Sequence, residues 1–153
     1  MTRLAAAALL AAIVSSIAMA TASAAPAPDG SWRAISDVDG KPAAMIRVKT
    51  GPGGVLQGWL TASLRGDDPN RVCDKCQPPR QNQRIVGMQV LWGVAPDPAN
   101  PLHWQNGQIL DPDSGGIYSA DVVESPDGKS LTVRGYFGVI TLGRTQMWYR
   151  AGA

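Results

Sequence analysis

The sequence predicts an all-β protein, a small antiparallel barrel of about eight strands. Short apolar runs alternate with polar residues at every second position, which is typical of half-buried strands. Clusters of Gly, Pro, Asp and Asn separate these runs at close intervals. A series of short strands joined by hairpins protects its edges by closing into a barrel or by folding as a sandwich, and we favour the barrel.

The N-terminus predicts a cleaved signal peptide over residues 1–24. Arg3 gives a positive start, residues 4–14 form an unbroken apolar run, and residues 22–24 (Ala-Ser-Ala) offer small side chains to signal peptidase. Polar residues interrupt the run before it reaches the length of a membrane span. The first cysteine is Cys73, so no thiol near the cleavage site accepts a lipid. We expect a soluble exported chain without a stable membrane anchor.

Cleavage after Ala24 leaves residues 25–153, which we interpret as a single barrel domain. These residues fall within the ordinary size range of one domain with its own core. Loss of Arg3 reduces the 14 basic residues to 13 against 12 acidic ones, a net charge of +1. Such a balance gives no electrostatic reason to expect binding to nucleic acid or to anionic membranes.

The strands can be placed from the alternation and from the turns between them. Asp39-Gly40 and Asp127-Gly128 lie between apolar runs and predict two hairpins, because these dipeptides tolerate positive φ angles. Residues 44–49 and 56–64 alternate as half-buried strands, with Leu56 and Leu60 on the face opposite Trp59.

Three further segments in the second half of the chain are candidate strands. In residues 131–137, the side chains of Leu131, Val133 and Phe137 share a face, and residues 145–150 predict a last, aromatic-rich strand. Residues 85–94 suit a buried strand or a short helix, and we favour a strand.

Cys73 and Cys76 are three residues apart and allow three interpretations. We favour a structural disulfide, which in so small a loop contributes roughly 2 kcal/mol. A redox-active pair usually lies at a helix N-terminus, but Pro78-Pro79 disfavours a helix here. Structural zinc needs about four ligands, and the chain adds only His103 and carboxylates. We therefore expect no metal site.

No segment predicts a catalytic centre. Residues 111–116 begin like a calcium loop but continue without its later ligands, so we interpret them as a polar turn. His103 is the one histidine, and its position at the start of a strand favours a surface or capping role. The sequence has no nucleophile elbow and no phosphate loop, so we expect a protein that is not an enzyme and binds no cofactor.

Two groups of residues are candidates for binding. Four basic residues concentrate in residues 67–84 and form either a solvated loop or an anion site: Arg71, Lys75, Arg80 and Arg84. Four aromatic residues lie on strands, where some side chains must point into the barrel, and are our candidate ligand contacts: Trp59, Trp104, Tyr118 and Tyr136.

Gly30-Ser31-Trp32 on the first strand, with Arg144 and Arg150 near the last, resembles the closing motif of lipocalin-type (calycin) barrels. In those barrels the Trp and the Arg pack across the closed end. We assign barrel closure to Trp32 and Arg144.

Motifs along nearly the whole mature chain resemble the domain of unknown function 2147 family of small exported bacterial proteins. In order, the motifs are Gly30-Ser31-Trp32, Cys73-Asp74-Lys75-Cys76, residues 85–88 (IVGM), Trp104 with Gly107, residues 109–112 (ILDP), Gly115 with Tyr118, residues 131–136 (LTVRGY), and residues 143–146 (GRTQ) with Trp148. One departure is Gly116-Ile117, where the family more often has a basic or polar pair. The resemblance implies a lipocalin-like barrel in the Gram-negative periplasm and implies no activity.

Three functional hypotheses follow. The first is a non-enzymatic periplasmic protein that binds a small apolar or amphipathic ligand in its barrel. The second is an envelope module with a filled barrel that binds another protein. The third is a thiol-redox protein that uses Cys73 and Cys76.

Overall fold

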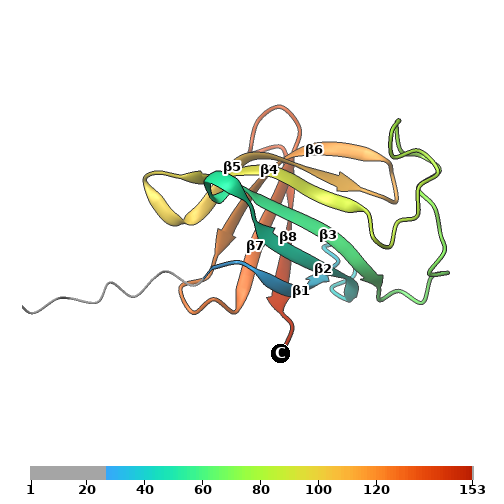
Figure 1. The fold of residues 1–153 in the computed structure, drawn as a ribbon, viewed down its shortest axis with the longest axis horizontal. Coiled ribbons are helices and arrows are strands. Elements are labelled where there is room, and N and C mark those ends of the chain that lie inside the picture. The colour runs from blue at the N-terminus through green and yellow to red at the C-terminus, as the bar shows by residue number, and fades with distance from the viewer. Residues whose placement is uncertain (1–26, 153) are drawn as a thin grey trace, which may run out of the picture.

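The computed structural model describes residues 27–152, so the expected signal peptide, residues 1–24, lies outside the described residues. Eight strands form a closed barrel in which each strand pairs with the next and β8 pairs with β1 (Figure 1). The predicted all-β barrel is therefore confirmed. The strands are β1 (Gly30–Ile35), β2 (Pro42–Thr50), β3 (Leu56–Ser63), β4 (Gln89–Asp97), β5 (Asn100–Asp111), β6 (Gly116–Glu124), β7 (Ser130–Tyr136) and β8 (Gly143–Arg150).

The connections fall alternately at two ends of the barrel, because every pair of neighbouring strands is antiparallel. One end carries the connections 36–41, 64–88, 112–115 and 137–142. We call it the mouth. The other end carries the short 3-10 turn η1 (Pro52–Gly54), the turn between β4 and β5, and the turn between β6 and β7. We call it the closed end.

The two predicted Asp-Gly hairpins are present, one at each end. Gly40 lies between β1 and β2 with a φ of +69°, and Gly128 lies between β6 and β7 with a φ of +67°. Only glycine adopts such angles without steric cost, so these turns follow directly from the sequence.

The alternation of β2 is also as predicted. Ile46 and Val48 are buried, while Arg47 and Lys49 are exposed. On β3, Leu56, Gly58 and Leu60 are buried, and Gly58 lets β3 approach its neighbours closely because an added Cβ would lie 3.1 Å from the Cβ of Leu91. Period-two burial of this kind gives the barrel an apolar interior and a polar exterior.

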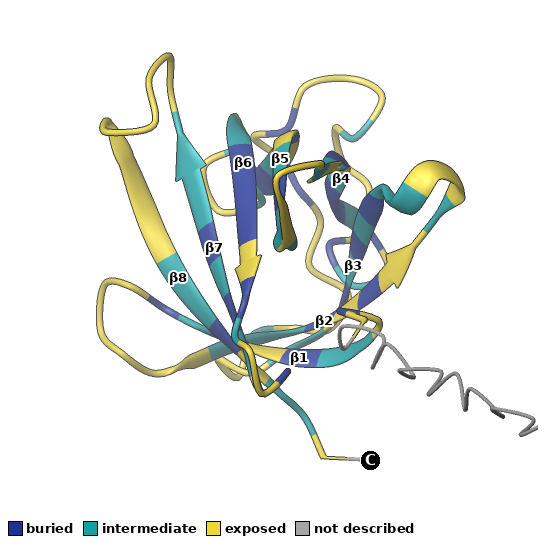
Figure 2. Cartoon of the chain, turned by 90° about the vertical axis from the view of Figure 1, so that its left-hand side faces the viewer, coloured by how far each residue is buried: buried dark blue, intermediate teal, exposed yellow. Residues whose placement is uncertain are grey.

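Large apolar side chains pack together in one core cluster inside the barrel. Figure 2 marks the buried stretches of the strands in dark blue. Burial of such side chains stabilises the fold by about 1.5–3 kcal/mol each. The bulky core residues with less than 2% of their surface exposed are Trp32, Val48, Leu56, Leu91, Val94, Val122, Leu131, Val133 and Trp148.

The arginine that packs on Trp32 is Arg150, not Arg144 as the sequence suggested. The guanidinium of Arg150 lies 4.3 Å from the centroid of the Trp32 ring and donates to the carbonyls of Ala27, Asp29 and Gly128. It also forms a 3.1 Å ion pair with the buried Glu124. Arg150 thus ties the N-terminal segment and the β6–β7 turn across the closed end.

Two other expectations differ from the structure. The predicted strand over residues 85–94 begins only at Gln89, because Ile85 and Met88 are buried within the connection that precedes β4. Phe137 was expected on the inner face of a strand, but β7 ends at Tyr136 and the Phe137 side chain is 77% exposed.

Candidate functional site

The barrel is hollow at its mouth. A cavity of about 280 Å³ opens there, and we call it the mouth cavity. Its walls are mainly apolar and come from all eight strands, with Ala34, Ala44, Ile46, Leu60, Val90, Ile109, Leu110, Tyr118, Val133 and Trp148 among the lining residues. The volume is close to the lower limit of about 300 Å³ for pockets that hold drug-sized molecules, so the occupant must be small or only partly enclosed.

Small residues at inward positions help to explain why this end is not filled. Ala34 on β1, Ala44 on β2 and Gly135 on β7 all line the mouth cavity. At the closed end, the corresponding interior is occupied by Trp32 and other large side chains. An eight-stranded barrel can be filled by side chains alone, so the choice of small residues at one end creates the cavity.

Charged residues surround the opening. The Nε of Arg144 lies 2.5 Å from a carboxylate oxygen of Asp37 and joins β8 to the β1–β2 connection. Arg65 and Arg71 both pair with Asp113, at 2.9 and 2.6 Å. The mouth cavity therefore has an apolar interior and a rim of ion pairs, which suits a molecule with an apolar part and a polar end.

The pKa of Asp113 reflects this position. Partial burial raises the pKa, but the hydrogen bond and charge of Arg71 and the charge of Arg65 outweigh burial and hold it below 3.8. Asp113 is thus a carboxylate at neutral pH and links the β3–β4 connection to the β5–β6 turn.

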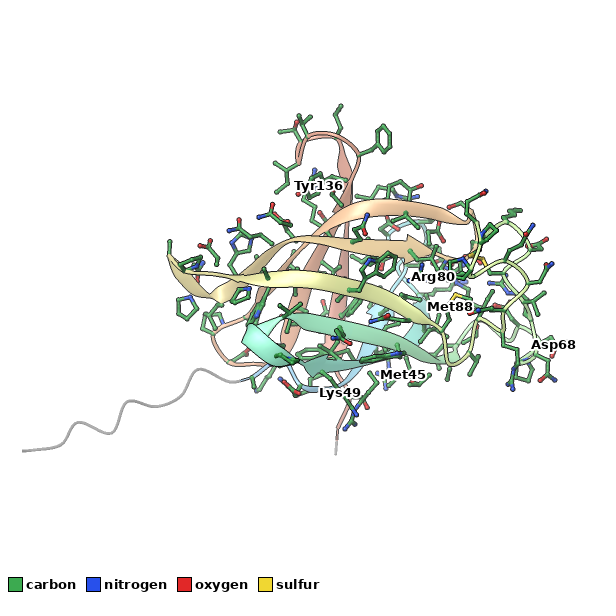
Figure 3. All side chains as sticks on the ribbon, turned by 45° about the horizontal axis from the view of Figure 1, so that its top comes forward. Met45, Lys49, Asp68, Arg80, Met88 and Tyr136 are labelled. Carbon is green, nitrogen blue, oxygen red and sulfur yellow. A yellow bond between two sulfur atoms is a disulfide. The ribbon has the colours of Figure 1, made fainter. Side chains whose placement is uncertain are left out.

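The β3–β4 connection, residues 64–88, is a folded cover on one side of the mouth. Cys73 and Cys76 form a disulfide within it, as predicted, and both are buried. Backbone bonds from Cys73 to Gln83 and from Asn82 to Cys73 hold the connection in a small hairpin. Gly115 fits beneath it, because a Cβ at this position would overlap the Lys75 carbonyl. Figure 3 shows this segment with its many side chains, including Asp68 and Arg80.

The four basic residues predicted within residues 67–84 all have partners. Arg71 pairs with Asp113, and the ammonium of Lys75 donates to the Asp113 carbonyl at 3.2 Å. The guanidinium of Arg80 lies 4.2 Å from the centroid of the Trp92 ring, and Arg84 donates to the Pro69 carbonyl. These contacts hold the cover on the barrel and give each charge a structural role.

Of the four aromatic candidates, two lie at the mouth cavity and two do not. Tyr118 and Tyr136 are lining residues, and the hydroxyl of Tyr136 also donates to Asp121 at 3.3 Å. Trp59 lies on the face of β3 opposite the buried Leu56 and Leu60. Trp104 is buried in the core, where its Nε1 donates to the carbonyl of Gly54 at the closed end.

Several cavity residues were not predicted from the sequence. Trp148 was recognised only as part of a motif, and the Asp37–Arg144 pair joins residues 107 positions apart. The apolar composition of residues 137–142 was the one local signal, since Phe137 and Leu142 both line the opening.

His103 lies on the outside of the barrel in a polar network. Its Nδ1 is 2.8 Å from Asp97 and its Nε2 is 3.7 Å from Asp121. Asp121 in turn accepts from the backbone N–H of Asn106 and from Tyr136. Both ring nitrogens thus face carboxylates, which orients the imidazole and links β4, β5, β6 and β7.

Within residues 27–152, no group of three or more His, Cys, Asp and Glu side chains is arranged to hold a metal ion. Asp111 of the calcium-like segment instead accepts from Ser114 and from the backbone of Asp113, as a polar turn does. In the same described part of the chain, no helix has the length and apolar character needed to cross a membrane.

Comparison with known proteins agrees with this architecture. Residues 30–150 match the family model described as an uncharacterised protein conserved in bacteria (DUF2147). No curated protein sequence matches the chain. The structure of protein HP1028 from the human pathogen Helicobacter pylori, described as belonging to the lipocalin family, superimposes with a TM-score of 0.70 at 14% identity, covering 82% of this chain and 83% of that one. This likeness shows the fold, a lipocalin-like barrel, and the family match over β1 to β8 shows that the chain belongs to the DUF2147 family.

Proposed function

We propose that this protein is a non-enzymatic binding protein of the bacterial periplasm that holds a small apolar or amphipathic molecule in the mouth cavity. The observation that carries the proposal is an open cavity of about 280 Å³ with apolar walls and a charged rim. Ligand sites typically combine apolar surface with a few polar groups that orient the ligand. A filled barrel would leave no such space.

The geometry favours an occupant whose apolar part enters the barrel and whose polar end remains at the rim. Val90, Leu110 and Val133 offer only apolar surface within the cavity. At the opening, Arg144 is 67% exposed and keeps donors free for a polar group while it pairs with Asp37. Tyr118, which is among the lining residues, adds an aromatic surface with a polar tip.

The test is a displacement assay on protein purified without detergent. Two fluorescent probes of different polarity, cis-parinaric acid and N-phenyl-1-naphthylamine, should gain fluorescence on binding. Ala44→Leu, which fills the cavity, should weaken binding at least about tenfold, because the added side chain takes the space of the ligand. The matched control is Ala99→Leu, which adds the same side chain to an exposed turn at the closed end.

Equal probe binding by wild type and Ala44→Leu would show that the mouth cavity is not the site. Native mass spectrometry of the same preparation should detect a co-purified small molecule. Location is tested separately: osmotic shock should release the protein with an intact mass that lacks residues 1–24. Retention of the full-length chain in the cytosol would overturn the periplasmic part of the proposal.

A further inference from the structure

The connection between β7 and β8 differs from the other parts of the mouth. Its sequence, residues 137–142 (Phe-Gly-Val-Ile-Thr-Leu), contains no charged side chain. Four of its residues are large, apolar and exposed: Phe137 at 77%, Val139 at 56%, Ile140 at 46% and Leu142 at 69%. We call these residues the apolar loop. It projects beyond the barrel next to Tyr136 (Figure 3) and is exposed along its length (Figure 2).

Exposed apolar side chains are concentrated in this one short connection. Another connection at the same end of the barrel, β1–β2, carries a single one, Val38, which is 77% exposed. Contiguous exposed apolar surface of this kind, as opposed to scattered single residues, usually marks an interaction site.

The backbone of the apolar loop is already hydrogen-bonded within the protein. The N–H groups of Phe137, Val139 and Leu142 donate to carbonyls of the same loop. The guanidinium of Arg134 donates to the carbonyls of Ile140, at 2.6 Å, and Thr141, at 3.2 Å. Backbone groups that enter an apolar medium must be satisfied internally, so this loop meets the main requirement for contact with lipid.

The charges at the base of the loop favour an anionic surface. Arg134 bonds to two carbonyls and to the hydroxyl of Thr145, none of which carries a charge, so its positive charge is not neutralised by these contacts. Arg144 lies two residues after the loop and is 67% exposed; because it pairs with Asp37, it adds exposed N–H donors but little net charge. An apolar tip with arginines at its base matches the layered order of hydrocarbon and anionic headgroups in a membrane.

We infer that the apolar loop docks the mouth of the barrel onto a phospholipid surface that contains anionic lipids. The loop inserts its side chains among the headgroups and acyl chains, and the arginines contact lipid phosphates. The inference goes beyond the proposed function, because docking depends on the outer surface of the loop and not on what the cavity holds. Its consequence is that the cavity opens towards the membrane.

The test is flotation of the chain with phosphatidylcholine vesicles, made with and without phosphatidylglycerol. Residues 25–153 are used, since they contain the complete barrel and its core. The loop variant is Val139→Thr with Ile140→Thr, because neither side chain lines the cavity. The matched control is Ile117→Thr with Val123→Thr, which are similarly exposed, at 40% and 41%, on the outer face of β6.

Wild type and the β6 control should bind vesicles equally, within about twofold, and more tightly when phosphatidylglycerol is present. The loop variant should bind at least about tenfold more weakly, because two apolar side chains no longer enter the lipid. In a Phe137→Trp variant, brominated lipids should quench fluorescence beyond the quenching seen with wild type, which reports insertion directly.

Equal vesicle binding by wild type and the loop variant would overturn the inference. A second outcome would also overturn it. If wild type binds no vesicles and is a dimer in light scattering, and if the loop variant is a monomer, the loop is an interface between two copies. Probe binding to the cavity separates the two proposals. If the loop variant loses vesicle binding but still binds the probe, the docking inference is supported independently of the cavity. If Ala44→Leu loses probe binding but still binds vesicles, the effect is confined to the cavity.

Discussion

Arg144 and Arg150 fit the same sequence pattern but lie in opposite surroundings. Arg150 packs on Trp32 and reaches the buried Glu124 at the closed end, whereas Arg144 pairs with Asp37 at the mouth. Both lie at even-numbered positions of β8, so alternation cannot distinguish them. The strand pairing decides, because Trp32 lies opposite Arg150 in the β1–β8 ladder. Sequence alone does not give that register.

Glu124 is a buried carboxyl group at the closed end. Only 1% of the residue is exposed, and its Oε2 has no hydrogen-bond partner within the described part of the chain. Burial raises the pKa of Glu124 above its ordinary value of 4.5, and the charge and hydrogen bond of Arg150 offset this only in part. A raised pKa means that the folded protein holds this proton more tightly than the unfolded chain does.

We therefore predict that Glu124→Gln becomes increasingly stable relative to wild type as the pH rises from 4.5 towards 8. The stability contributed by protonated Glu124 is complete below pH 4.5 and is lost as the pH rises through the raised pKa of the folded state. The glutamine stays neutral throughout. Urea denaturation of both proteins across this pH range measures the difference in the free energy of unfolding.

Carboxylates whose pKa values are lowered in the folded protein by other partners, such as Asp113 and Asp127, are present in both proteins and cancel in that difference. A difference that is flat with pH would show that the Glu124 carboxyl is effectively solvated. A difference that falls with rising pH would show that Arg150 stabilises the ionised form more than burial destabilises it.

At the scale of the elements, the strands were more predictable than the connections. Hairpins at Gly40 and Gly128 follow from local turn chemistry, and the alternation of β2 follows from a period of two. The start of β4 at Gln89 could not be predicted from the sequence. Ile85 and Met88 are apolar and buried, as strand residues would be, but they belong to the connection that precedes β4.

The site was less predictable than the fold for a related reason. Tyr118 and Tyr136 contribute to the mouth cavity, whereas Trp104, equally aromatic and also on a strand, belongs to the packed core. Where a side chain lies along the barrel axis depends on the stagger between strands and on irregularities such as the register shift between Met45 and Ile46. None of these has a local sequence signal.

The disulfide should stabilise the β3–β4 connection locally and have little effect on the stability of the barrel strands. We predict that replacing both cysteines, Cys73→Ser with Cys76→Ser, increases amide hydrogen exchange in residues 64–88 and leaves exchange in β6 and β7 nearly unchanged. The disulfide closes a loop of about four residues and so contributes roughly 2 kcal/mol, mostly to the local order of the connection.

Hydrogen exchange followed by mass spectrometry checks this prediction with peptide resolution. The contact of Asp113 with Arg65 and Arg71 remains in the variant and should keep the connection on the barrel. Uniformly faster exchange in all strands would contradict the prediction, because it would show that the disulfide holds the whole fold together.

At the scale of the whole molecule, the barrel combines a packed half with a hollow half. Leu56 is fully buried near the closed end, and Ala44 lines the mouth cavity on the neighbouring strand. The two halves share one continuous sheet, but they differ in whether the interior space is already occupied. Stability should therefore depend mainly on the first half and binding on the second.

This division predicts opposite outcomes for two substitutions of similar size. Leu56→Ala leaves a cavity in packed surroundings and should cost about 2–5 kcal/mol of unfolding free energy while probe binding per folded molecule stays within about twofold. Ala44→Leu adds a side chain to empty space and should cost less than about 1.5 kcal/mol, although it should weaken probe binding at least about tenfold. Urea denaturation and probe titration on the same samples measure both quantities. If Ala44→Leu destabilised the protein as strongly as Leu56→Ala, the mouth would have to be packed as tightly as the closed end, and a barrel with no free interior could not hold a ligand.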